Sequence, residues 1–251
     1  MSFDVGADAY LRFMGRFSEP LAVSFADLAG LSRGRRVLDV GCGPGALTAE
    51  LVRRQGTARV SAVDPSPSFV AAVRERLPGV DARLAAAEQL PFPDGSFEVV
   101  LAQLVVHFMA DPVAGLREMG RVAGGGTVAA CVWDYAGGRG PLSLFWRAAR
   151  DLDPAAPDES GRAGVREGHL AELFGQAGLG PVRDGLLTVG SRYASFEDWW
   201  EPFTLGIGPA GSYVAALADE DRVALREHCR DLLPRGPIEV TACAWAAACP
   251  P

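Results

Sequence analysis

The nine residues Val37–Gly45 constrain the fold of this chain more than any other segment. The segment begins with an apolar run, Val37–Val40, interrupted only by Asp39, and such a run is typical of a parallel strand covered on both faces. The turn that follows contains three glycines, Gly41, Gly43 and Gly45. Glycine allows the backbone to turn tightly and a ligand to touch it. A helical stretch at residues 46–54 follows at once and aims unpaired N–H groups at the turn. The segment therefore predicts a cofactor site.

Asp39 is the unusual member of this segment, because it places a carboxylate near the end of an otherwise apolar strand. Burial of that charge is costly unless a cation or a hydrogen-bond donor meets it. We therefore expect the ligand to present a positive group to Asp39.

The spacing Gly41-x-Gly43-x-x-Ala46, with Asp64 further along, also fits the fingerprint of a dinucleotide site. A pyrophosphate would sit badly beside Asp39, because like charges repel. The Pro44-Gly45 pair makes the turn wider and stiffer than a diphosphate requires. A nicotinamide or flavin cofactor is thus the weaker alternative.

Four segments in order resemble the class I S-adenosylmethionine (SAM) dependent methyltransferases. Val37–Gly45 is similar to motif I, and Val60–Asp64 to the second strand with its ribose-binding acid. Ala87–Phe97 resembles the Ala-Glu-x-Leu-Pro-Phe segment that borders the adenine. Asp111–Trp133 is similar to the helix-and-strand unit that follows it. The resemblance covers roughly residues 10–135.

This resemblance implies SAM as the cofactor. Asp39 and the carbonyl of Gly41 would bind the methionine ammonium end, and Asp64 would accept hydrogen bonds from the ribose hydroxyls. The main chain at Gln103 and Leu104 would lie beside the methionine part. The expected cofactor-binding residues are Asp39, Gly41, Cys42, Gly43, Gly45, Asp64, Pro65, Ser66, Ala87, Glu88, Gln103, Leu104, Tyr10 and Arg16.

The chain departs from the family pattern at two places. Many relatives carry Asp or Ser before the Ala-Glu pair, where this chain has Ala86, so adenine recognition would rest on backbone groups near Ala87 and on Glu88. The usual Arg-Pro-Gly-Gly turn is replaced by Ala123–Gly126, which lacks the proline. Since that turn lies away from the cofactor edge of the sheet, we expect a local loop difference there.

Strand and helix signals alternate along the chain, which predicts an α/β fold with a doubly wound, Rossmann-like sheet and helices on both faces. The resemblance implies seven mostly parallel strands, the last of them antiparallel. The expected strands are 36–40, 59–64, 82–85, 97–102, 127–133, 182–189 and 238–245. The expected helices are 46–54, 67–77, 112–122, 142–152, 169–177 and 220–233.

The length of 251 residues suits a single class I methyltransferase domain spanning residues 1–251. We expect residues 31–135 to form the SAM-binding core. Residues 136–168 and 195–235 break the strand–helix rhythm and are expected to be inserts on the substrate side.

Residues 1–30 are expected to form a helical N-terminal lid, or else a helix that packs on the domain core. Both interpretations fit the stripe that runs from Tyr10 through Phe13 to Phe17. Tyr10 and Arg16 are the residues of this segment expected to reach the cofactor.

His107 follows the fourth strand by a few residues and is a candidate general base for an acceptor hydroxyl. The alternative is a packed histidine at a helix start. Trp199 and Trp200 are adjacent, so on a helix only one is expected to face inward. If one of these rings lines the acceptor pocket, the acceptor is apolar or aromatic.

Composition excludes several classes of function. A net charge of −7 and a pI near 5.1 argue against a nucleic-acid partner. The chain has no lysine, which excludes Schiff-base chemistry. Five cysteines without a Cys-x-x-Cys pair fit a reducing cytoplasm, and the three histidines show no metal-ligand spacing. The N-terminus has no apolar core of signal-peptide length, and no apolar stretch is long enough for a membrane span.

The sequence thus predicts a cytoplasmic SAM-dependent methyltransferase that acts on O, N or C of a small molecule, as a monomer or homodimer. Two alternatives remain open. One is a SAM-binding protein of this fold with another reaction or a structural role, and the other is an NAD(P)-dependent oxidoreductase.

Overall fold

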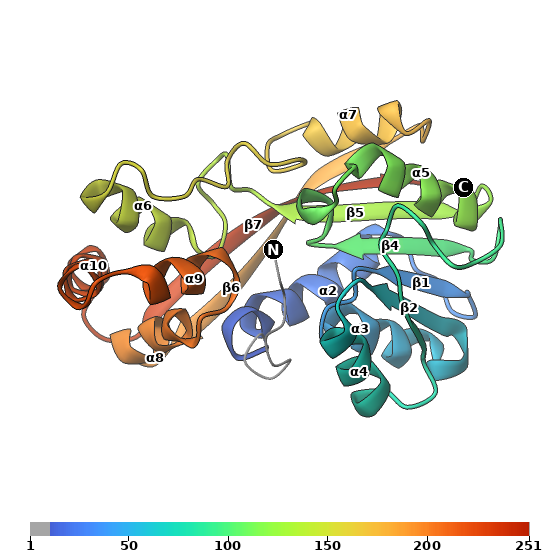
Figure 1. Ribbon diagram of the computed structural model, residues 1–251. Helices are drawn as coiled ribbons and strands as arrows, with labels where there is room; N and C mark the ends of the chain where they lie inside the picture. Colours follow the sequence, from blue (N-terminus) through green and yellow to red (C-terminus); the bar gives the residue numbers. More distant parts are fainter. Residues whose placement is uncertain (1–10, 251) are drawn as a thin grey trace.

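The computed structural model describes residues 11–250, and its centre is one seven-stranded sheet (Figure 1). The strand order is β3-β2-β1-β4-β5-β7-β6. The strands are β1 (Val37–Val40), β2 (Val60–Asp64), β3 (Asp81–Leu84), β4 (Val99–Gln103), β5 (Thr127–Trp133), β6 (Arg183–Tyr193) and β7 (Ile238–Cys249).

The first five strands pair in parallel, and β7 pairs antiparallel with both β5 and β6. The predicted α/β fold with an antiparallel last strand is confirmed. After β1 the chain builds outward to β2 and β3, then returns to β4 on the other side of β1. This reversal opens a crevice at the carboxyl ends of β1 and β4, which is where ligands bind in sheets of this kind.

Helices cover both faces of the sheet, as predicted. The helices are α2 (Arg16–Leu28), α3 (Ala46–Gln55), α4 (Pro67–Arg76), α5 (Pro112–Ala123), α6 (Ser143–Leu152), α7 (His169–Gln176), α8 (Phe196–Trp200), α9 (Gly208–Ala216) and α10 (Asp219–Leu232). Short helical turns occur at η1 (Leu11–Gly15), η2 (Thr57–Arg59), η3 (Val106–Phe108) and η4 (Glu201–Leu205). In Figure 1, α2, α3 and α4 lie below the sheet and α5 and α7 lie above it, and each group encloses its own apolar cluster.

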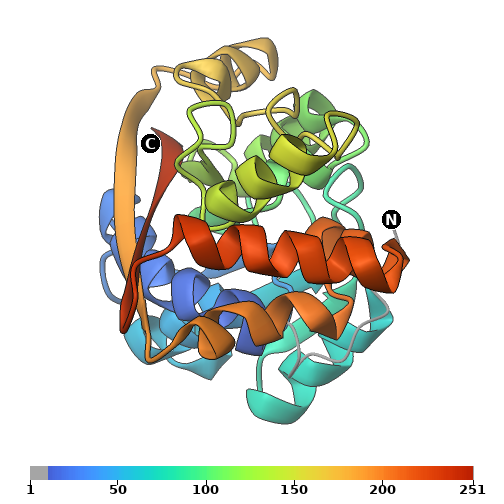
Figure 2. The same ribbon diagram turned by 90° about the vertical axis from the view of Figure 1, so that its left-hand side faces the viewer.

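The strands β6 and β7 are longer than predicted and carry a helical lobe built from α6, α8, α9 and α10 (Figure 1). The two strands are this long because they pair with each other without a break. The antiparallel ladder runs from the pair Arg183↔Ala248 to the pair Tyr193↔Ile238. Seen from the end, α10 runs across the molecule beside α6 (Figure 2).

An aromatic core holds this lobe together. The rings of Phe145 on α6 and Phe203 on η4 stack with centroids 4.5 Å apart. The expectation that only one of Trp199 and Trp200 faces inward is wrong, since both are buried, 2% and 6% exposed. Trp200 of the short helix α8 stacks on Phe196 with nearly parallel rings and packs against Phe145 of α6, while Trp199 packs against Phe203 of η4.

The described part of the N-terminal segment packs as a core helix. Phe17, Leu21 and Phe25 of α2 are fully or almost fully buried, and α2 contacts both α3 and β6. Arg16 at its start forms an ion pair with Asp198 of α8, with 2.5 Å between their closest nitrogen and oxygen. The helix therefore ties the lobe to the sheet.

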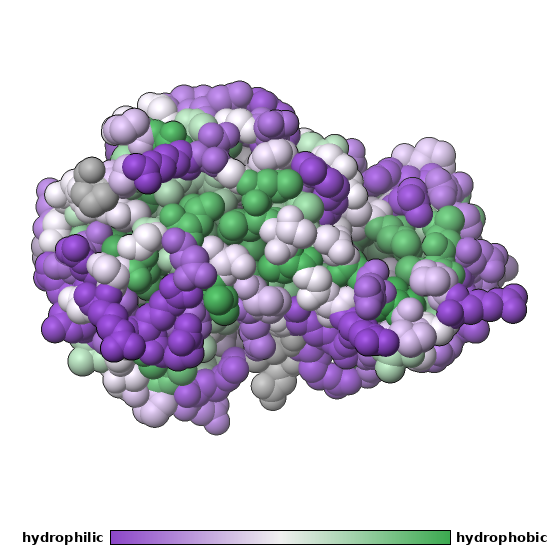
Figure 3. Space-filling view, turned by 180° about the vertical axis from the view of Figure 1, so that it is seen from behind, coloured by the Kyte–Doolittle hydropathy of each residue, from purple (hydrophilic) through white to green (hydrophobic). Residues whose placement is uncertain are grey.

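Seen from behind, hydrophilic residues surround a middle region where apolar residues gather (Figure 3). The large apolar side chains exposed by more than a third are Val23, Leu84, Leu152, Leu186 and Val223, each on a different element. No helix among residues 11–250 is long and apolar enough to cross a membrane.

Candidate functional site

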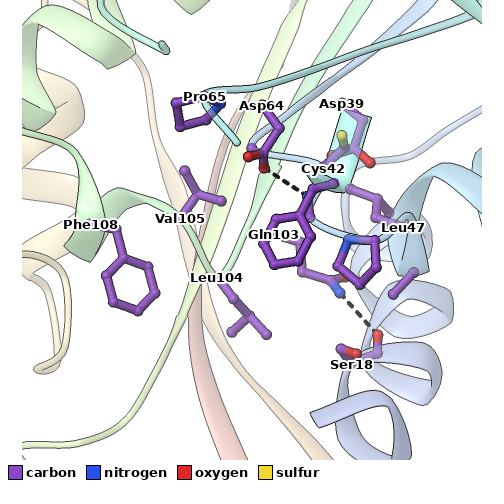
Figure 4. Close-up of a pocket in the computed structure, with 15 residues that line it drawn as sticks. Ser18, Asp39, Cys42, Leu47, Asp64, Pro65, Gln103, Leu104, Val105 and Phe108 are labelled. Carbon is purple, nitrogen blue, oxygen red and sulfur yellow. Dashed lines mark hydrogen bonds between the residues drawn. The ribbon is translucent and has the colours of Figure 1, made fainter. Parts of the chain in front are cut away.

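The carboxyl ends of β1, β2 and β4 surround a pocket (Figure 4). It is lined by Ser18, Asp39, Gly41, Cys42, Gly43, Pro44, Ala46, Leu47, Asp64, Pro65, Phe69, Gln103, Leu104, Val105 and Phe108. The pocket lies at the crevice that the strand order predicts.

The glycine turn after β1 forms one wall of the pocket. Gly41 and Gly43 have φ angles of +70° and +52°, a backbone region that residues other than glycine rarely adopt. The N–H groups of Gly41 and Cys42 both donate to the carbonyl of Val63, at 2.8 and 3.0 Å. A Cβ added at Gly41 would lie only 2.3 Å from a methyl carbon of Val105. The turn is therefore fitted between the ends of β2 and β4.

Asp64 holds the second wall in place. Its carboxylate accepts one hydrogen bond from the N–H of Gly43, at 2.9 Å, and one from the N–H of Ser66, at 2.8 Å. Burial raises the pKa of Asp64, while these two hydrogen bonds oppose the shift. A carboxylate has about four acceptor positions, so Asp64 retains capacity for further donors.

Three buried oxygen atoms of residues that line the pocket have no hydrogen-bond partner among residues 11–250: Asp39 Oδ1, Gln103 Oε1 and Ser18 Oγ. The other polar atoms of these side chains are engaged, since Asp39 Oδ2 accepts from Thr48 and Gln103 Nε2 donates to the Ser18 carbonyl (Figure 4). Buried polar groups left without partners are costly. The pocket is thus complementary to a ligand that donates several hydrogen bonds.

The electrostatics favour a cation. Burial, together with the nearby Asp64 carboxylate, raises the pKa of Asp39 to about 7, although the hydrogen bond from Thr48 opposes the shift. No arginine lies among the described residues that line this pocket. A bound cation would therefore stabilise the charged form of Asp39.

The pocket brings together Asp39, Gly41, Cys42, Gly43, Asp64, Pro65, Gln103 and Leu104 of the predicted set. Gly45 and Ser66 lie beside it as the N-caps of α3 and α4.

The other predicted residues do not line the pocket. Glu88 accepts hydrogen bonds from the N–H groups of Ala110 and Asp111 and so holds the loop before α5. Ala87 is buried in the cluster under that helix. Arg16 is engaged by Asp198, and Tyr10 lies outside the described residues.

The predicted set did not include seven residues that line the pocket: Ser18, Pro44, Ala46, Leu47, Phe69, Val105 and Phe108. Ser18 reaches the pocket from α2 through a contact with Gln103, 85 positions away in the chain. No local pattern marks such a residue.

A second pocket adjoins the first and shares Leu104 and Phe108 with it. Its lining is Phe13, Met14, Leu104, His107, Phe108, Trp133, Tyr135, Leu142, Glu159, Ile207, Gly208 and Pro209. Leu104 has a φ of +63°, so the wall between the pockets is built on strained backbone of the kind found at functional sites.

His107 belongs to this second pocket and is 6% exposed. Burial lowers its pKa to about 3, helped by the charge of Arg162. Its imidazole is therefore neutral at physiological pH. Among residues 11–250, no group of three or more His, Cys, Asp or Glu side chains is arranged to hold a metal ion.

Comparison with known proteins identifies the family. A family model described as a methyltransferase domain matches residues 38–130. An uncharacterized methyltransferase of Mycobacterium tuberculosis is 33% identical over 230 residues, 91% of this chain and 78% of that protein. Trans-aconitate 2-methyltransferase of the same species is 40% identical over 105 residues, 41% of this chain but only 38% of that protein's length.

Solved structures share the fold. Geranyl diphosphate C-methyltransferase of Streptomyces coelicolor, in complex with Mg²⁺, geranyl diphosphate and S-adenosylhomocysteine, superimposes with a TM-score of 0.54 at 18% identity and covers 93% of this chain and 79% of its own. SpnF, a 4+2 cyclase, gives 0.55 at 21% identity, with 93% and 80% covered. The chain belongs to the class I SAM-dependent methyltransferase family, and this membership decides against a nicotinamide oxidoreductase.

Replacement of Gly41 by alanine tests the fit of the turn. Gly41→Ala and Gly43→Ala both place a side chain at positive φ, which costs about 1–2 kcal/mol. Only Gly41→Ala also collides with Val105, whereas Gly43 has open space around it. We expect a lower Tm and weaker S-adenosylhomocysteine binding for Gly41→Ala than for Gly43→Ala, and partial recovery when Val105→Ala is added. Equal losses in the two single variants would contradict the packing described above.

Cofactor binding should depend on pH through Asp39. The free protein holds a proton on Asp39 below a pKa of about 7, and a cationic ligand favours its release. The affinity for S-adenosylhomocysteine should therefore rise with pH by up to about tenfold per unit below pH 7, then level off. Calorimetry from pH 5.5 to 7.5 measures this, and Asp39→Asn should remove the dependence. A wild-type affinity that is flat over this range would show that Asp39 does not meet the cation.

Proposed function

We propose that the protein is an enzyme that transfers a methyl group from SAM to O, N or C of a small-molecule acceptor. When bound, SAM supplies a methyl group activated by a sulfonium. The observation that carries the proposal is the buried pocket in which Asp39 and Gln103 each present an unpartnered oxygen.

The residues of the first pocket fit SAM. The ammonium end of SAM would donate hydrogen bonds to three oxygen atoms, namely Asp39 Oδ1, Gln103 Oε1 and Ser18 Oγ. These atoms have no hydrogen-bond partner among residues 11–250. Asp64 has acceptor capacity left for the ribose hydroxyls. A diphosphate would meet two buried carboxylates, Asp39 and Asp64, and no arginine of the described lining.

The second pocket is the proposed acceptor site. Its residues Leu104, His107, Trp133 and Ile207 are all less than a tenth exposed, and walls of this kind do not admit a folded protein or a nucleic acid. Enclosure also excludes water from the transfer. We infer from these features that the acceptor is a small molecule held directly beside the cofactor.

The two pockets support the proposed division of the chain into a SAM-binding core and two inserts on the substrate side. Residues 31–135 supply most of the first pocket. The segments 136–168 and 195–235 contribute Leu142, Glu159 and Ile207 to the second. In a single domain spanning residues 1–251, the inserts would therefore select the acceptor.

We also propose that the protein works in the cytoplasm. Its five cysteines all lie in the described region, and all are free and buried, as expected in a reducing compartment. The proposed assembly is a monomer or homodimer.

A second candidate function is SAM binding without methyl transfer. The fold of SpnF, a 4+2 cyclase, shows that this architecture accommodates other chemistry in that protein. Turnover of an acceptor separates the two candidates.

Calorimetry with S-adenosylhomocysteine and NAD tests the cofactor. We expect binding of the first and not of the second. Asp64→Ala should weaken S-adenosylhomocysteine binding by about 1–3 kcal/mol, because its hydrogen bonds are lost. Asp94→Ala is the matched control, since Asp94 is an exposed carboxylate outside the pocket. Incubation with SAM carrying a labelled methyl group and small-molecule extracts, followed by mass spectrometry, then detects a methylated product.

His107→Ala should reduce kcat with little change in S-adenosylhomocysteine affinity, because His107 lines the acceptor pocket and not the cofactor pocket. With its pKa near 3, His107 should add no inflection to the kcat profile between pH 5 and 8, whether it orients the acceptor or takes up its proton. Equal losses of turnover and cofactor affinity would reassign His107 to packing.

A further inference from the structure

The acceptor pocket contains polar atoms that its own walls do not satisfy. Trp133 is 1% exposed and His107 is 6% exposed, and both line the pocket. Trp133 Nε1 and both ring nitrogens of His107 have no hydrogen-bond partner among residues 11–250. Neutral imidazole offers one donor and one acceptor, and an indole N–H is a donor only. These residues therefore supply both kinds of hydrogen-bonding group to a ligand.

Charge in the same pocket is already balanced. Glu159 is the one acidic residue of the described lining, and it is 5% exposed. Its carboxylate accepts from Trp146 Nε1 at 3.2 Å and forms an ion pair with Arg162 at 3.4 Å. No arginine belongs to the described lining, so the pocket offers an anion no cation of its own.

The remaining walls are apolar and largely aromatic. Phe13, Phe108 and Tyr135 contribute rings, and Leu142 and Ile207 contribute aliphatic surface. The ring centroids of His107 and Phe108 lie 3.9 Å apart, and those of His107 and Tyr135 lie 5.8 Å apart in a T-shaped arrangement. Such walls favour a flat ligand, because ring stacking and burial both stabilise it.

We propose that the methyl acceptor is a neutral, planar molecule with a hydroxyl or similar polar group, held by the indole N–H of Trp133 and the imidazole of His107. The inference rests on the proposed function, since it specifies the acceptor of that reaction. The hydroxyl oxygen accepts from Trp133 and its hydrogen donates to a His107 nitrogen. A polycarboxylate is excluded, because its charges would enter an apolar cavity without a free cation.

Binding of naphthol, naphthalene and naphthoate to the protein saturated with S-adenosylhomocysteine tests this specificity. We expect naphthol to bind at least about fivefold more tightly than naphthalene, which lacks the polar group, and more tightly than naphthoate, which is charged. Trans-aconitate, as a polycarboxylate, should not bind. If naphthoate or trans-aconitate binds as tightly as naphthol, or if naphthol fails to bind at millimolar concentration, the proposal is overturned.

Trp133→Phe isolates the indole N–H. It should reduce the preference for naphthol over naphthalene, whereas a cavity left by the smaller ring would weaken both ligands alike. Trp245→Phe is the matched control, because its Nε1 donates to Asp134 outside the pocket. An unchanged preference in Trp133→Phe, with a wild-type Tm, would remove Trp133 from acceptor recognition.

Glu159→Gln tests the charge argument. The amide keeps an acceptor for Trp146 and releases Arg162 from its ion pair, so naphthoate binding should strengthen by several-fold. No change in naphthoate binding would contradict the balanced-charge explanation. These measurements report on ligand binding alone. Failure to bind S-adenosylhomocysteine would defeat the proposed function, whereas loss of the naphthol preference with cofactor binding intact would defeat only this inference.

Discussion

The burial of the Asp39 carboxylate at the end of β1 is the constraint on which the rest of the site depends. The side chain is 1% exposed, and one of its oxygens has no partner among residues 11–250. Since an isolated buried charge is costly, the protein holds this group near its ionisation point and leaves open space beside it. A cationic ligand removes that cost. The affinity for such a ligand therefore comes from Asp39, a residue of the central strand β1.

The backbone around Asp39 forms the walls of the pocket into which this carboxylate faces. The glycine turn fits between Val63 and Val105 and leaves no room for a Cβ at Gly41. On the β4 side, Leu104 adopts a left-handed conformation and places its side chain on the wall between the two pockets. Leu104 therefore separates the two pockets, and in the proposed function it would stand between the cofactor and the acceptor.

Much of this could be predicted because its signals are local. The strand at Val37–Val40, the turn after it and the acid at Asp64 lie where the sequence placed them, and the sheet with its antiparallel last strand is as expected. The predictions for Glu88 and Ala87 fared differently, since the structure packs both near α5 and away from the pocket lining. Adenine recognition by backbone groups near Ala87 stays a prediction, whereas the Glu88 carboxylate is already engaged by the loop before α5. Both Trp199 and Trp200 are buried because Trp200 packs against Phe145 of α6 and Trp199 against Phe203 of η4, which the periodicity of one helix does not reveal.

The sequence alone determined the class of fold and the first pocket around Asp39, because a buried strand, a glycine turn and a carboxylate are specified by residues next to one another in the chain. Tertiary structure alone decided the second pocket. Phe13, Trp133, Glu159 and Ile207 come from four distant segments and share a pocket only because β6 and β7 extend past the sheet and carry the helical lobe over it. Contacts of that kind depend on long-range packing, which leaves no periodic or spaced pattern in the sequence.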